Sequence, residues 1–409
     1  MSKSIDAALL QQDFITYCQI NTRSDAASTA YPSTPGQTVL AKKLVTQLTA
    51  LGLSDVALHE DGFVYATLPA NGSDADPIGF IAHLDTADYA AENVHPLVHP
   101  DYDGSPIQFE NGLKLTVDEF PKLKQYFGET LITSDGTTLL GVDDKAGIAA
   151  AVASARYLLA HPEIKHGEIR FGFGPDEEIG RGGKHLDTKA FATKFAYTLD
   201  NGTLGQMEFE TFNGAEAKIE ITGTSVHPGE AKNLMVNALS LAEKLDASLP
   251  QFERPEFTQD HEGFFALLHL TGTVDHASLY YIIRDHDHNL FEGRKATIQK
   301  AVAEINATLD RPRIALTLND QYYNIYDVLK KDSTPYDLAT KAIKAVGLTP
   351  EAVPFRGGTD GTFITYNGIP TPNLFNGGIN FHGPYECVST QAMVKVAETI
   401  VKVIALAAE

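Results

Sequence analysis

The sequence predicts an α/β protein of two domains, in which a mixed sheet flanked by helices carries a smaller inserted α+β domain. Hydrophobic strand-like segments alternate with helical segments over about residues 60–210, which is typical of α/β layers with a largely buried sheet. Over about residues 214–323 this alternation gives way to another order of elements. The 409 residues suffice for two hydrophobic cores, because single cores usually stop growing at roughly 250–300 residues.

Three strands and three helices are expected in the larger domain. The strands are Pro77 to Thr86, Gly167 to Gly174 and Lys194 to Asp200. The helix after DDKAG places hydrophobic residues on one face, namely Ile148, Val152, Ala155 and Leu159. The other two helices are amphipathic: one opens the chain, and one follows Ser389, a suitable N-cap.

The inserted segment has the order strand, helix, strand, strand, helix, strand, which is the ferredoxin-like unit. We expect its first helix over Glu230 to Ala247, and its second helix to carry Ile298, Val302 and Ile305 in phase. The predicted domains are 1–212 and 325–409, which form the larger one, and 213–324, which is inserted.

Charge and cysteine content exclude several classes of function. The 53 acids against 32 bases give a formal charge of -21, which repels nucleic acid and anionic membranes. Asp6 and Asp13 interrupt the N-terminal hydrophobic residues, so this segment predicts a helix and not a secretory signal. The two cysteines, Cys18 and Cys387, form no metal or disulfide pattern, and we expect a cytoplasmic protein.

Polar residues that interrupt hydrophobic strands are the candidates for chemistry, because ligands of open α/β sheets usually collect at strand carboxyl ends. The first pair is His83 and Asp85, in PIGFIAHLDT. Residues two apart on a strand point to the same face, so Asp85 can orient the His83 ring, as acids do behind metal-bound histidines. An ordinary strand-end histidine beside an acid would show the same pattern.

Asp143 and Asp144 follow the hydrophobic run LLGV and precede a helix. Unpaired N–H groups at a helix N-terminus favour an acid, so capping explains one of the two. A metal ligand and a cap together would explain both.

The stretch GFGPDEEIGRGG places Asp176, Glu177 and Glu178 in a row, and Pro175 marks the end of the preceding strand. Beyond Pro175 the chain can turn and bring both glutamates to one pocket, where one binds a metal and the other moves a proton. A solvated acidic turn is the alternative. Asp176 has no assigned chemistry, and we expect a turn residue or a support for its neighbours.

Asp200 closes AYTLDNG, and His382 lies in the glycine-rich GGINFHGPYE. Each can be an ordinary turn residue. Together with the other positions they supply two histidines and several carboxylates at successive strand ends. That mixture suits two divalent ions that share a bridging carboxylate. No GxSxG or P-loop sequence competes with this interpretation.

The sequence also resembles a known family. The segments that carry the resemblance include IGFIAHLDT, LLGVDDKAGIA, GPDEEIGRGGKHLD, VHPGEAKNLMVNALSLA, YYIIRDHD, FRGGTDGT and NGGINFHGPYE. In order and spacing they resemble the peptidase T family, the tripeptide aminopeptidases within a superfamily of di-zinc aminopeptidases, carboxypeptidases and amidohydrolases. The resemblance runs from the N-terminal helix to the last one, and it implies a zinc-exopeptidase-like catalytic domain.

The resemblance implies two Zn²⁺ per subunit. His83, Asp143 and Asp200 match the ligands of one zinc, and Asp143, Glu178 and His382 match those of the other. A cis peptide bond is implied at Asp143-Asp144, where Asp143 is the bridge. Asp85 matches the acid behind the first histidine, and Glu177 matches the general base. The implied reaction is release of the N-terminal residue of a tripeptide by zinc-activated water.

The inserted domain matches the lid of this family, and a homodimer through the lid is implied. His227 matches a lid histidine that reaches substrate. Arg284 and Arg356 match arginines that hold the peptide's carboxylate, for which a planar guanidinium is well suited. A turn histidine and surface ion pairs are the alternatives for these three residues.

Two other functions remain compatible with the sequence. The same metal core serves dipeptidases and N-acyl amino acid amidohydrolases, which differ mainly in the lid and the pocket. A catalytically silent peptide-binding relative is the other, although all five proposed ligands and Glu177 are present.

Overall fold

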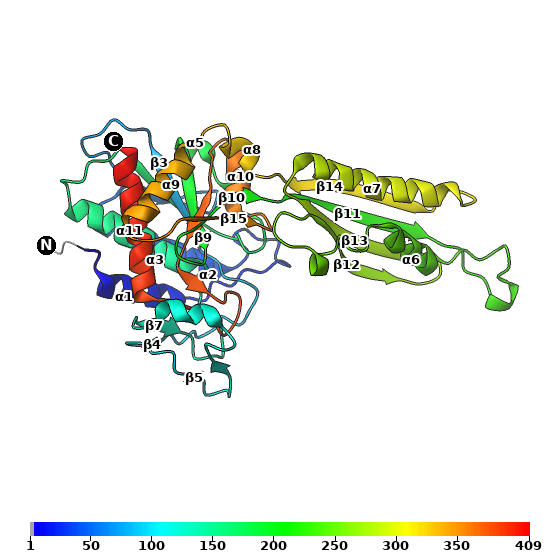
Figure 1. Cartoon of the computed structure of the whole chain (residues 1–409), viewed down its shortest axis with the longest axis horizontal. Coiled ribbons are helices and arrows are strands. Elements are labelled where there is room, and N and C mark those ends of the chain that lie inside the picture. The colour runs from blue at the N-terminus through cyan, green and yellow to red at the C-terminus, as the bar shows by residue number, and fades with distance from the viewer. Residues whose placement is uncertain (1–3) are drawn as a thin grey trace. The chain divides into compact units, whose positions relative to one another are not determined.

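The structure is a computed structural model that describes residues 4–409, and the chain divides into two compact units. The first comprises the residues up to Phe209 together with Asp327–Val353 and Thr359–Glu409, and it contains both ends of the chain (Figure 1). The second comprises Glu210–Tyr326 and Pro354–Gly358. The sequence did not lead us to expect that Pro354–Gly358 joins the second unit. The boundaries 212/213 and 324/325 stay a prediction.

An eight-stranded mixed sheet forms the centre of the first unit. In spatial order its strands are β1 (Ser54–Leu58), β2 (Val64–Leu68), β8 (Ile169–Gly174), β3 (Ile78–His83), β9 (Phe195–Asn201), β16 (Asn373–Phe375), β10 (Gln206–Thr211) and β15 (Glu351–Phe355). β8, β3, β9 and β16 run parallel to one another, whereas β1, β2 and β10 pair antiparallel. The parallel strands therefore end at one common edge.

Helices cover this sheet. The long ones are α1 (Ala7–Cys18), α2 (Pro35–Leu51), α3 (Val142–Ala160), α9 (Thr334–Ala345) and α11 (Thr390–Ala407), and the short ones are α4 (Gly182–His185), α5 (Thr188–Phe191), α8 (Tyr326–Leu329) and α10 (Asp360–Tyr366). α3 packs on β3 and β9 and is covered by α1 and α11. Such contacts on both sides explain why α3 is buried almost throughout.

Smaller elements complete this unit. A second sheet has the order β17 (Gly378–Ile379), β18 (Cys387–Ser389), β7 (Leu131–Thr133) and β4 (Leu97–His99). β5 (Ile107–Gln108) pairs with β6 (Lys114–Leu115), and a 3-10 helix covers Pro121–Tyr126. The second sheet connects the segment before α3 with the segment before α11, because β18 pairs with β7.

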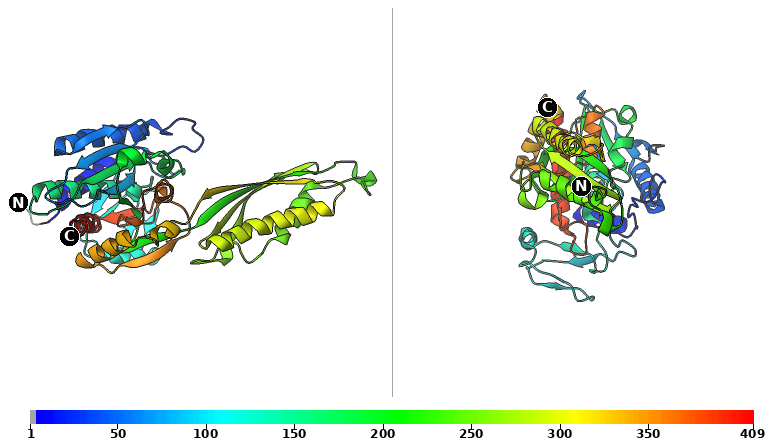
Figure 2. Two further views of the ribbon diagram at one scale, coloured as in Figure 1. Left: turned by 90° about the horizontal axis from the view of Figure 1, so that it is seen from above. Right: turned by 90° about the vertical axis from the view of Figure 1, so that its right-hand side faces the viewer.

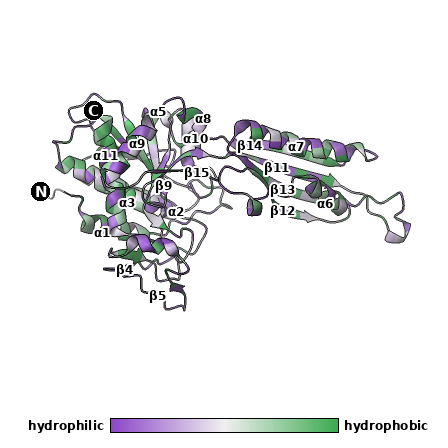
Figure 3. Ribbon diagram, viewed as in Figure 1, coloured by the Kyte–Doolittle hydropathy of each residue, from purple (hydrophilic) through white to green (hydrophobic). Residues whose placement is uncertain are grey.

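The second unit is a four-stranded antiparallel sheet with two helices on one face (Figure 2). Its strand order is β12 (Phe264–Gly272), β13 (His276–Asp285), β11 (Asn213–Thr222) and β14 (Ile314–Tyr322). The helices are α6 (Ala238–Ser248) and α7 (His288–Ala307), and short 3-10 turns cover Pro228–Glu230 and Pro255–Phe257. Hydrophobic and hydrophilic residues alternate along α7 (Figure 3), of which Phe291, Ile298 and Ile305 are buried against the sheet.

The predicted fold is confirmed, with one correction to an element. The mixed sheet, its flanking helices and the β-α-β-β-α-β order of the insertion all match the expectation. The first helix of the insertion, however, begins at Ala238 and not at Glu230. Asn233 has a left-handed conformation with φ 61°, and the Asn237 side chain accepts a hydrogen bond from Leu239 N as the N-cap. Within residues 4–409 no helix is long and hydrophobic enough to cross a membrane.

One buried glutamate predicts a measurable pH dependence of stability. Glu208 on β10 accepts a hydrogen bond from Asn373 Nδ2 (2.8 Å), and burial raises the pKa of Glu208 from 4.5 to about 7. The folded chain then binds this proton more tightly than the unfolded chain, so stability falls as pH rises from about 4.5 to about 7. Glu208→Gln removes this loss, which is roughly 3 kcal/mol, and we expect the variant to gain stability over wild type with rising pH.

Urea unfolding of both proteins at pH 5 and pH 8 measures this difference. The exposed Glu119→Gln serves as the control and should show no such gain. A stability difference between wild type and Glu208→Gln that is the same at both pH values would contradict the prediction.

Candidate metal centre and active site

The candidate site lies at the edge where the parallel strands of the first unit end. His83 is the last residue of β3 and lies opposite Gly174, the last residue of β8. β8 leads directly into Asp176, Glu177 and Glu178, and Asp200 lies near the end of β9. The parallel register therefore brings together acids and a histidine that are more than 90 residues apart in sequence.

Asp143 lies between two histidines. His83 Nε2 is 2.8 Å from Asp143 Oδ1, and His382 Nε2 is 3.1 Å from Asp143 Oδ2. Each carboxylate oxygen thus faces a different imidazole, which is the arrangement expected of a bridging ligand. The Asp143-Asp144 peptide bond is cis, as the resemblance implies.

The remaining proposed ligands surround this core. His83 Nε2 is 3.5 Å from Asp200 Oδ1, and His382 Nε2 is 3.2 Å from Glu178 Oε1. Ligand atoms of His83, Asp143 and Glu178 all lie within 4.8 Å of one another, as do those of His83, Asp144 and Asp200. The structure therefore brings all five residues predicted as ligands to one place.

Asp144 also belongs to this cluster, although it was not among the five predicted ligands. Its Oδ1 accepts hydrogen bonds from Gly147 N (3.2 Å) and Asn376 Nδ2 (3.3 Å), so it caps the regular part of α3. Its other oxygen is buried without a hydrogen bond. The sequence suggested both a cap and a ligand for the pair of aspartates, and the structure assigns the cap to Asp144.

The electrostatics of the cluster fit divalent cations. Burial and the Asp143 charge raise the pKa of both Asp200 and Glu178. Burial alone would lower the pKa of His83, but Asp200 and Asp143 outweigh it and raise that pKa well above its usual value. Asp144 Oδ2 is buried without a hydrogen-bond partner, and the buried Glu178 Oε1 faces His382 Nε2 at 3.2 Å. Imidazole nitrogens and carboxylate oxygens placed together in this way match the ligand preferences of zinc and similar cations.

Asp85 supports the site from behind. It is completely buried, and its two oxygens accept hydrogen bonds from Glu177 N (3.0 Å) and Glu178 N (3.1 Å). The same carboxylate lies 3.4 Å from His83 Nδ1, which also faces the Asp85 carbonyl oxygen at 3.1 Å. Asp85 therefore orients the imidazole and fixes the backbone of both glutamates.

Glu177 lies in this turn beside the cluster of ligands. Burial raises the pKa of its carboxyl group well above the usual value, and the charges of Asp200 and Asp360 raise it further. Perturbed acids of this kind are concentrated at functional sites.

Glu386 was missed by the sequence reasoning. It is buried, and Oε2 accepts hydrogen bonds from Leu140 N (2.9 Å) and Gly141 N (2.7 Å), while Oε1 accepts one from Asp143 N (3.1 Å). Burial raises the pKa of Glu386 to about 7. Its place four residues after His382 is the only sequence signal, and it joins the loops of two proposed ligands.

The three substrate-binding candidates lie in the second unit. His227 is exposed, and its Nδ1 accepts a hydrogen bond from Gly229 N (3.2 Å). Arg284 is buried, donates to the carbonyl oxygens of Ala215 and Ile283, and stacks on Tyr322.

Arg356 donates two hydrogen bonds from Nη1, to the carbonyl oxygens of Asp260 and Glu262, and one from Nη2 to Thr258 Oγ1. Its guanidinium also stacks on Phe212 and Phe264. None of these partners is a carboxylate, so the guanidinium of Arg356 is held by neutral oxygens and aromatic rings of the second unit.

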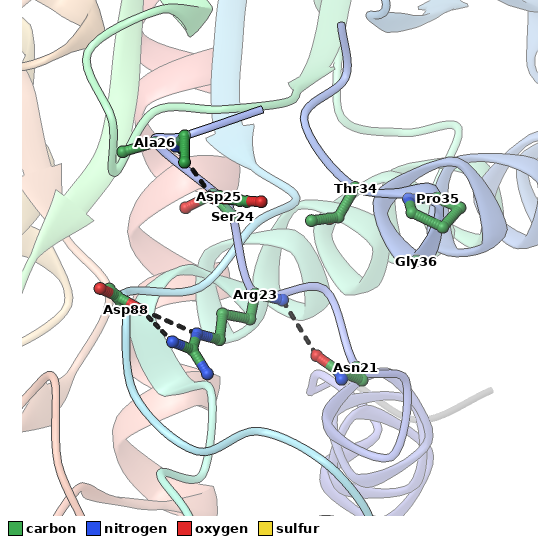
Figure 4. Close-up of a pocket in the computed structure, with 10 residues that line it drawn as sticks. Asn21, Arg23, Ser24, Asp25, Ala26, Thr34, Pro35, Gly36 and Asp88 are labelled. Carbon is green, nitrogen blue, oxygen red and sulfur yellow. Dashed lines mark hydrogen bonds and ion pairs between the residues drawn. The ribbon is translucent and has the colours of Figure 1, made fainter. Parts of the chain in front are cut away.

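A pocket in the first unit lies beside the N-terminus of α2, between that helix and the segment Asn21–Ala27. Arg23 reaches across it and binds the Asp88 carboxylate (Figure 4). It contains none of the proposed metal ligands.

Comparison with known proteins gives consistent results. Residues 130–406 match the model of peptidase family M20/M25/M40. The chain is 52% identical over 404 residues to peptidase T of Limosilactobacillus fermentum, covering 98% of each chain. It is 49% identical over 401 residues to peptidase T of Geobacillus kaustophilus, covering 97% of this chain and 98% of that one.

Among solved structures, aminopeptidase PepT of Bacillus cereus superposes with a TM-score of 0.79 at 24% identity, covering 99% of this chain and all of that one. A dinuclear metal-binding peptidase of the M20 family from Bacillus subtilis superposes with a TM-score of 0.68 at 13% identity, covering 98% of both chains. These two similarities concern the fold alone.

The hydrogen bonds of Glu386 predict a loss of stability in Glu386→Gln. A glutamine can present only one acceptor atom, so its amide N–H group must face at least one of the three backbone N–H donors. We expect the metal-free variant to lose about 1–3 kcal/mol of unfolding free energy at pH 5, where Glu386 is protonated and its replacement removes no buried charge. Urea unfolding measures this, with Glu119→Gln as control. Equal stability of Glu386→Gln and wild type would show that these bonds contribute nothing net.

Proposed function

The chain belongs to peptidase family M20/M25/M40, in its peptidase T branch, and from this premise we propose that it releases the N-terminal residue of tripeptides by zinc-dependent hydrolysis. The observation that carries the proposal is the cluster of two histidines and two carboxylates around the Asp143 bridge, with Glu177 held beside them. The names of the relatives at 49–52% identity support the tripeptide substrate.

We assign two zinc ions to the cluster. His83, Asp143 and Asp200 would hold one, and Asp143, Glu178 and His382 would hold the other. The distances from each histidine to Asp143, and from His382 Nε2 to Glu178 Oε1, support this division. When bound, the ions supply positive charge that eases deprotonation of water and stabilises negative charge on the scissile carbonyl oxygen.

Glu177 is the proposed general base. Its carboxylate accepts a proton from the attacking water as the water oxygen bonds to the carbonyl carbon of the first peptide bond. The C–N bond then breaks, and Glu177 returns the proton to the departing amine. The hydrogen bond from Glu177 N to Asp85 supports this role, because it fixes the backbone from which the base projects.

The limit to tripeptides is proposed to come from the second unit. Arg356 and Arg284 would bind the peptide's C-terminal carboxylate, and His227 would contact the substrate near the scissile bond. The neutral oxygen partners of the Arg356 guanidinium support this, because a substrate carboxylate is a stronger partner for a guanidinium than a carbonyl oxygen.

Assembly and location extend the same proposal. We propose a homodimer through the second unit, where β12 and β14 are open sheet edges and Leu268 and Leu270 are exposed. Sedimentation velocity would test it, and a monomer at micromolar concentration would contradict it. Cys18 and Cys387 are both free thiols, which agrees with the proposed cytoplasmic location.

Replacement of the base separates chemistry from metal binding. Glu177→Gln keeps the volume of the side chain but cannot accept the proton, so we expect kcat to fall about 10²–10⁴-fold. Zinc content, measured by mass spectrometry on the same sample, should remain two ions per chain in the variant and in wild type. Glu119→Gln is the control for a neutralised surface glutamate. Turnover near the wild-type rate would exclude Glu177 as the base.

Replacement of Arg356 tests the grip on the C-terminus. We expect Arg356→Ala to raise KM for tripeptides by about tenfold or more, because a charge-assisted pair contributes about 1.5–3 kcal/mol. The variant should also show a smaller preference for tripeptides over di- and tetrapeptides. Arg356→Lys keeps the charge without the fork, and its KM should fall between the two. Arg254→Ala, another arginine of the second unit, controls for damage to that unit. Unchanged kinetics of Arg356→Ala with the peptide panel would rule out the assignment.

A further inference from the structure

We propose that Asp176, the first acid of the DEE stretch, is a positioning residue for Glu177 and Glu178. Its hydrogen bonds with Ser33 and Gln37 attach the turn that carries the two glutamates to the start of α2, and we call this attachment the clasp. The proposal rests on the proposed role of Glu177 as base. It concerns how the chain fixes that base, and its test includes a readout that needs neither metal nor activity.

The side chain of Asp176 forms all its hydrogen bonds with one segment, residues 33–37. Asp176 is completely buried, and Oδ2 accepts a hydrogen bond from Ser33 N (2.8 Å). Oδ1 accepts from Ser33 Oγ (2.5 Å) and from Gln37 Nε2 (2.7 Å). In return, Asp176 N donates to Gln37 Oε1 (3.0 Å). Asp176 and Gln37 therefore form a reciprocal pair across 139 residues of sequence. A solvated acidic turn has no such set of partners.

The backbone of Asp176 is equally constrained. Its φ of 60° lies in the left-handed region, which only glycine, asparagine and aspartate adopt at low cost. Its carbonyl oxygen accepts hydrogen bonds from Arg181 N (2.9 Å) and Gly182 N (3.1 Å), so the chain from 176 to 182 closes on itself. The reversal at Asp176 is the step that separates the strand from the two glutamates.

A second contact closes the clasp on the other side of the glutamates. Arg181 Nη1 donates to Ser28 O (2.9 Å), and Nη2 donates to Ala26 O (3.2 Å). Residues 26–33 are thus bound to the turn both before and after Glu177 and Glu178. The Asp85 carboxylate binds the amides of the same two glutamates. The turn is therefore bound to two other segments of the chain, residues 26–37 and Asp85.

Such a turn matters because a general base must reach its proton within hydrogen-bond distance, and misplacement by about 1 Å can cost about 10²-fold in rate. The Asp176 carboxylate does not contact the atoms proposed to coordinate metal. Because Ser33 and Gln37 occupy both of its oxygens, it does not face a cavity either. Its effect on the reaction must therefore act through the position of Glu177.

The hydrogen-bond pattern requires a carboxylate at position 176. Three donors converge on its two oxygens, two on Oδ1 and one on Oδ2. In Asp176→Asn the amide group faces either Ser33 N–H or the Gln37 amide N–H, and in both orientations two donors oppose each other. The backbone conformation is unaffected in principle, because asparagine also tolerates positive φ.

The same pattern predicts a compensating exchange. In Asp176→Asn with Gln37→Glu, the carboxylate moves to position 37, where it accepts from the side-chain amide and the backbone N–H group of the asparagine at position 176. The amide oxygen of that asparagine still accepts from Ser33 N, and the Ser33 hydroxyl can turn to accept. The double variant therefore restores the complementarity that each single variant breaks, with no change in net charge.

The experiment compares Asp176→Asn, Gln37→Glu and the double variant with wild type. We expect Asp176→Asn to lower kcat for a tripeptide about ten- to hundredfold, with KM within about threefold and zinc content unchanged. Hydrogen–deuterium exchange of the metal-free proteins should be faster over residues 24–34 and 175–182 in both single variants. The double variant should return both exchange and kcat to within about threefold of wild type.

Two further variants guard against a trivial loss of folding. Asp13→Asn removes the partner of Arg156 between α1 and α3, and it should change thermal stability without changing kcat. Ser33→Ala removes one of the three donors, and it should lower kcat in the same direction by a smaller factor even if Asp176→Asn does not fold.

The outcomes are distinct from those for the proposed function. A kcat of Asp176→Asn within twofold of wild type, or a loss of kcat that the double variant does not recover, overturns the positioning role. Wild-type exchange rates in Asp176→Asn overturn the clasp itself. Full turnover in Glu177→Gln would instead overturn the assigned base, and the exchange measurements would still decide whether the clasp exists.

Discussion

The concentration of negative charge at one edge of the central sheet is the constraint that the rest of the first unit has to meet. Six carboxylates gather there, from Asp85, Asp143, Asp144, Glu177, Glu178 and Asp200. Burial raises the pKa of most of them, and the neighbouring charges add to it. Uncompensated burial of this kind costs several kcal/mol per ion, so each carboxylate needs a partner.

The fold supplies these partners in two ways. Asp85 and Glu386 accept hydrogen bonds with both oxygens from backbone N–H groups of the segments that carry the ligands, and Asp144 Oδ1 accepts one from Gly147 N in α3. Asp143, Glu178 and Asp200 instead face His83 and His382. Imidazole nitrogens and carboxylate oxygens are the ligands that zinc takes in proteins. The carboxylates of the first kind are stabilised by backbone N–H dipoles that the fold holds in place. The carboxylates that face the histidines remain available to a bound cation.

The sequence predicted the parts of the site that depend on strand ends. His83 and Asp200 lie at the ends of β3 and β9, and Glu178 follows β8, so the parallel pairing of these strands brings the three residues to one edge. Asp143 begins α3 and His382 lies in the loop after β17, and for these two the family resemblance carried the prediction. The β-α-β-β-α-β order of the insertion was equally readable, because periodicity marks each element.

The sequence could not show the supporting residues, because their partners are distant in the chain. Glu386 binds amides about 245 residues away, and Asp176 binds Ser33 143 residues away. No local pattern distinguishes such an acid from a solvated one. The late start of α6 was missed for a similar reason: the hydrophobic period continues before Asn237, but the backbone at Asn233 does not permit a helix there.

The three adjacent acids Asp176, Glu177 and Glu178 show how these roles separate. The positive φ at Asp176 reverses the chain, so its side chain meets Ser33 and Gln37 while the amides of the two glutamates meet Asp85. Asp176 has both oxygens satisfied by hydrogen bonds from Ser33 and Gln37, whereas the buried Glu178 Oε1 faces the His382 imidazole at 3.2 Å. An acid whose oxygens are all satisfied within the fold has nothing left to offer a cation or a proton. The partners of each carboxylate, and not the acidic run, therefore distinguish the residue that faces the proposed metal site from the residue that holds the turn.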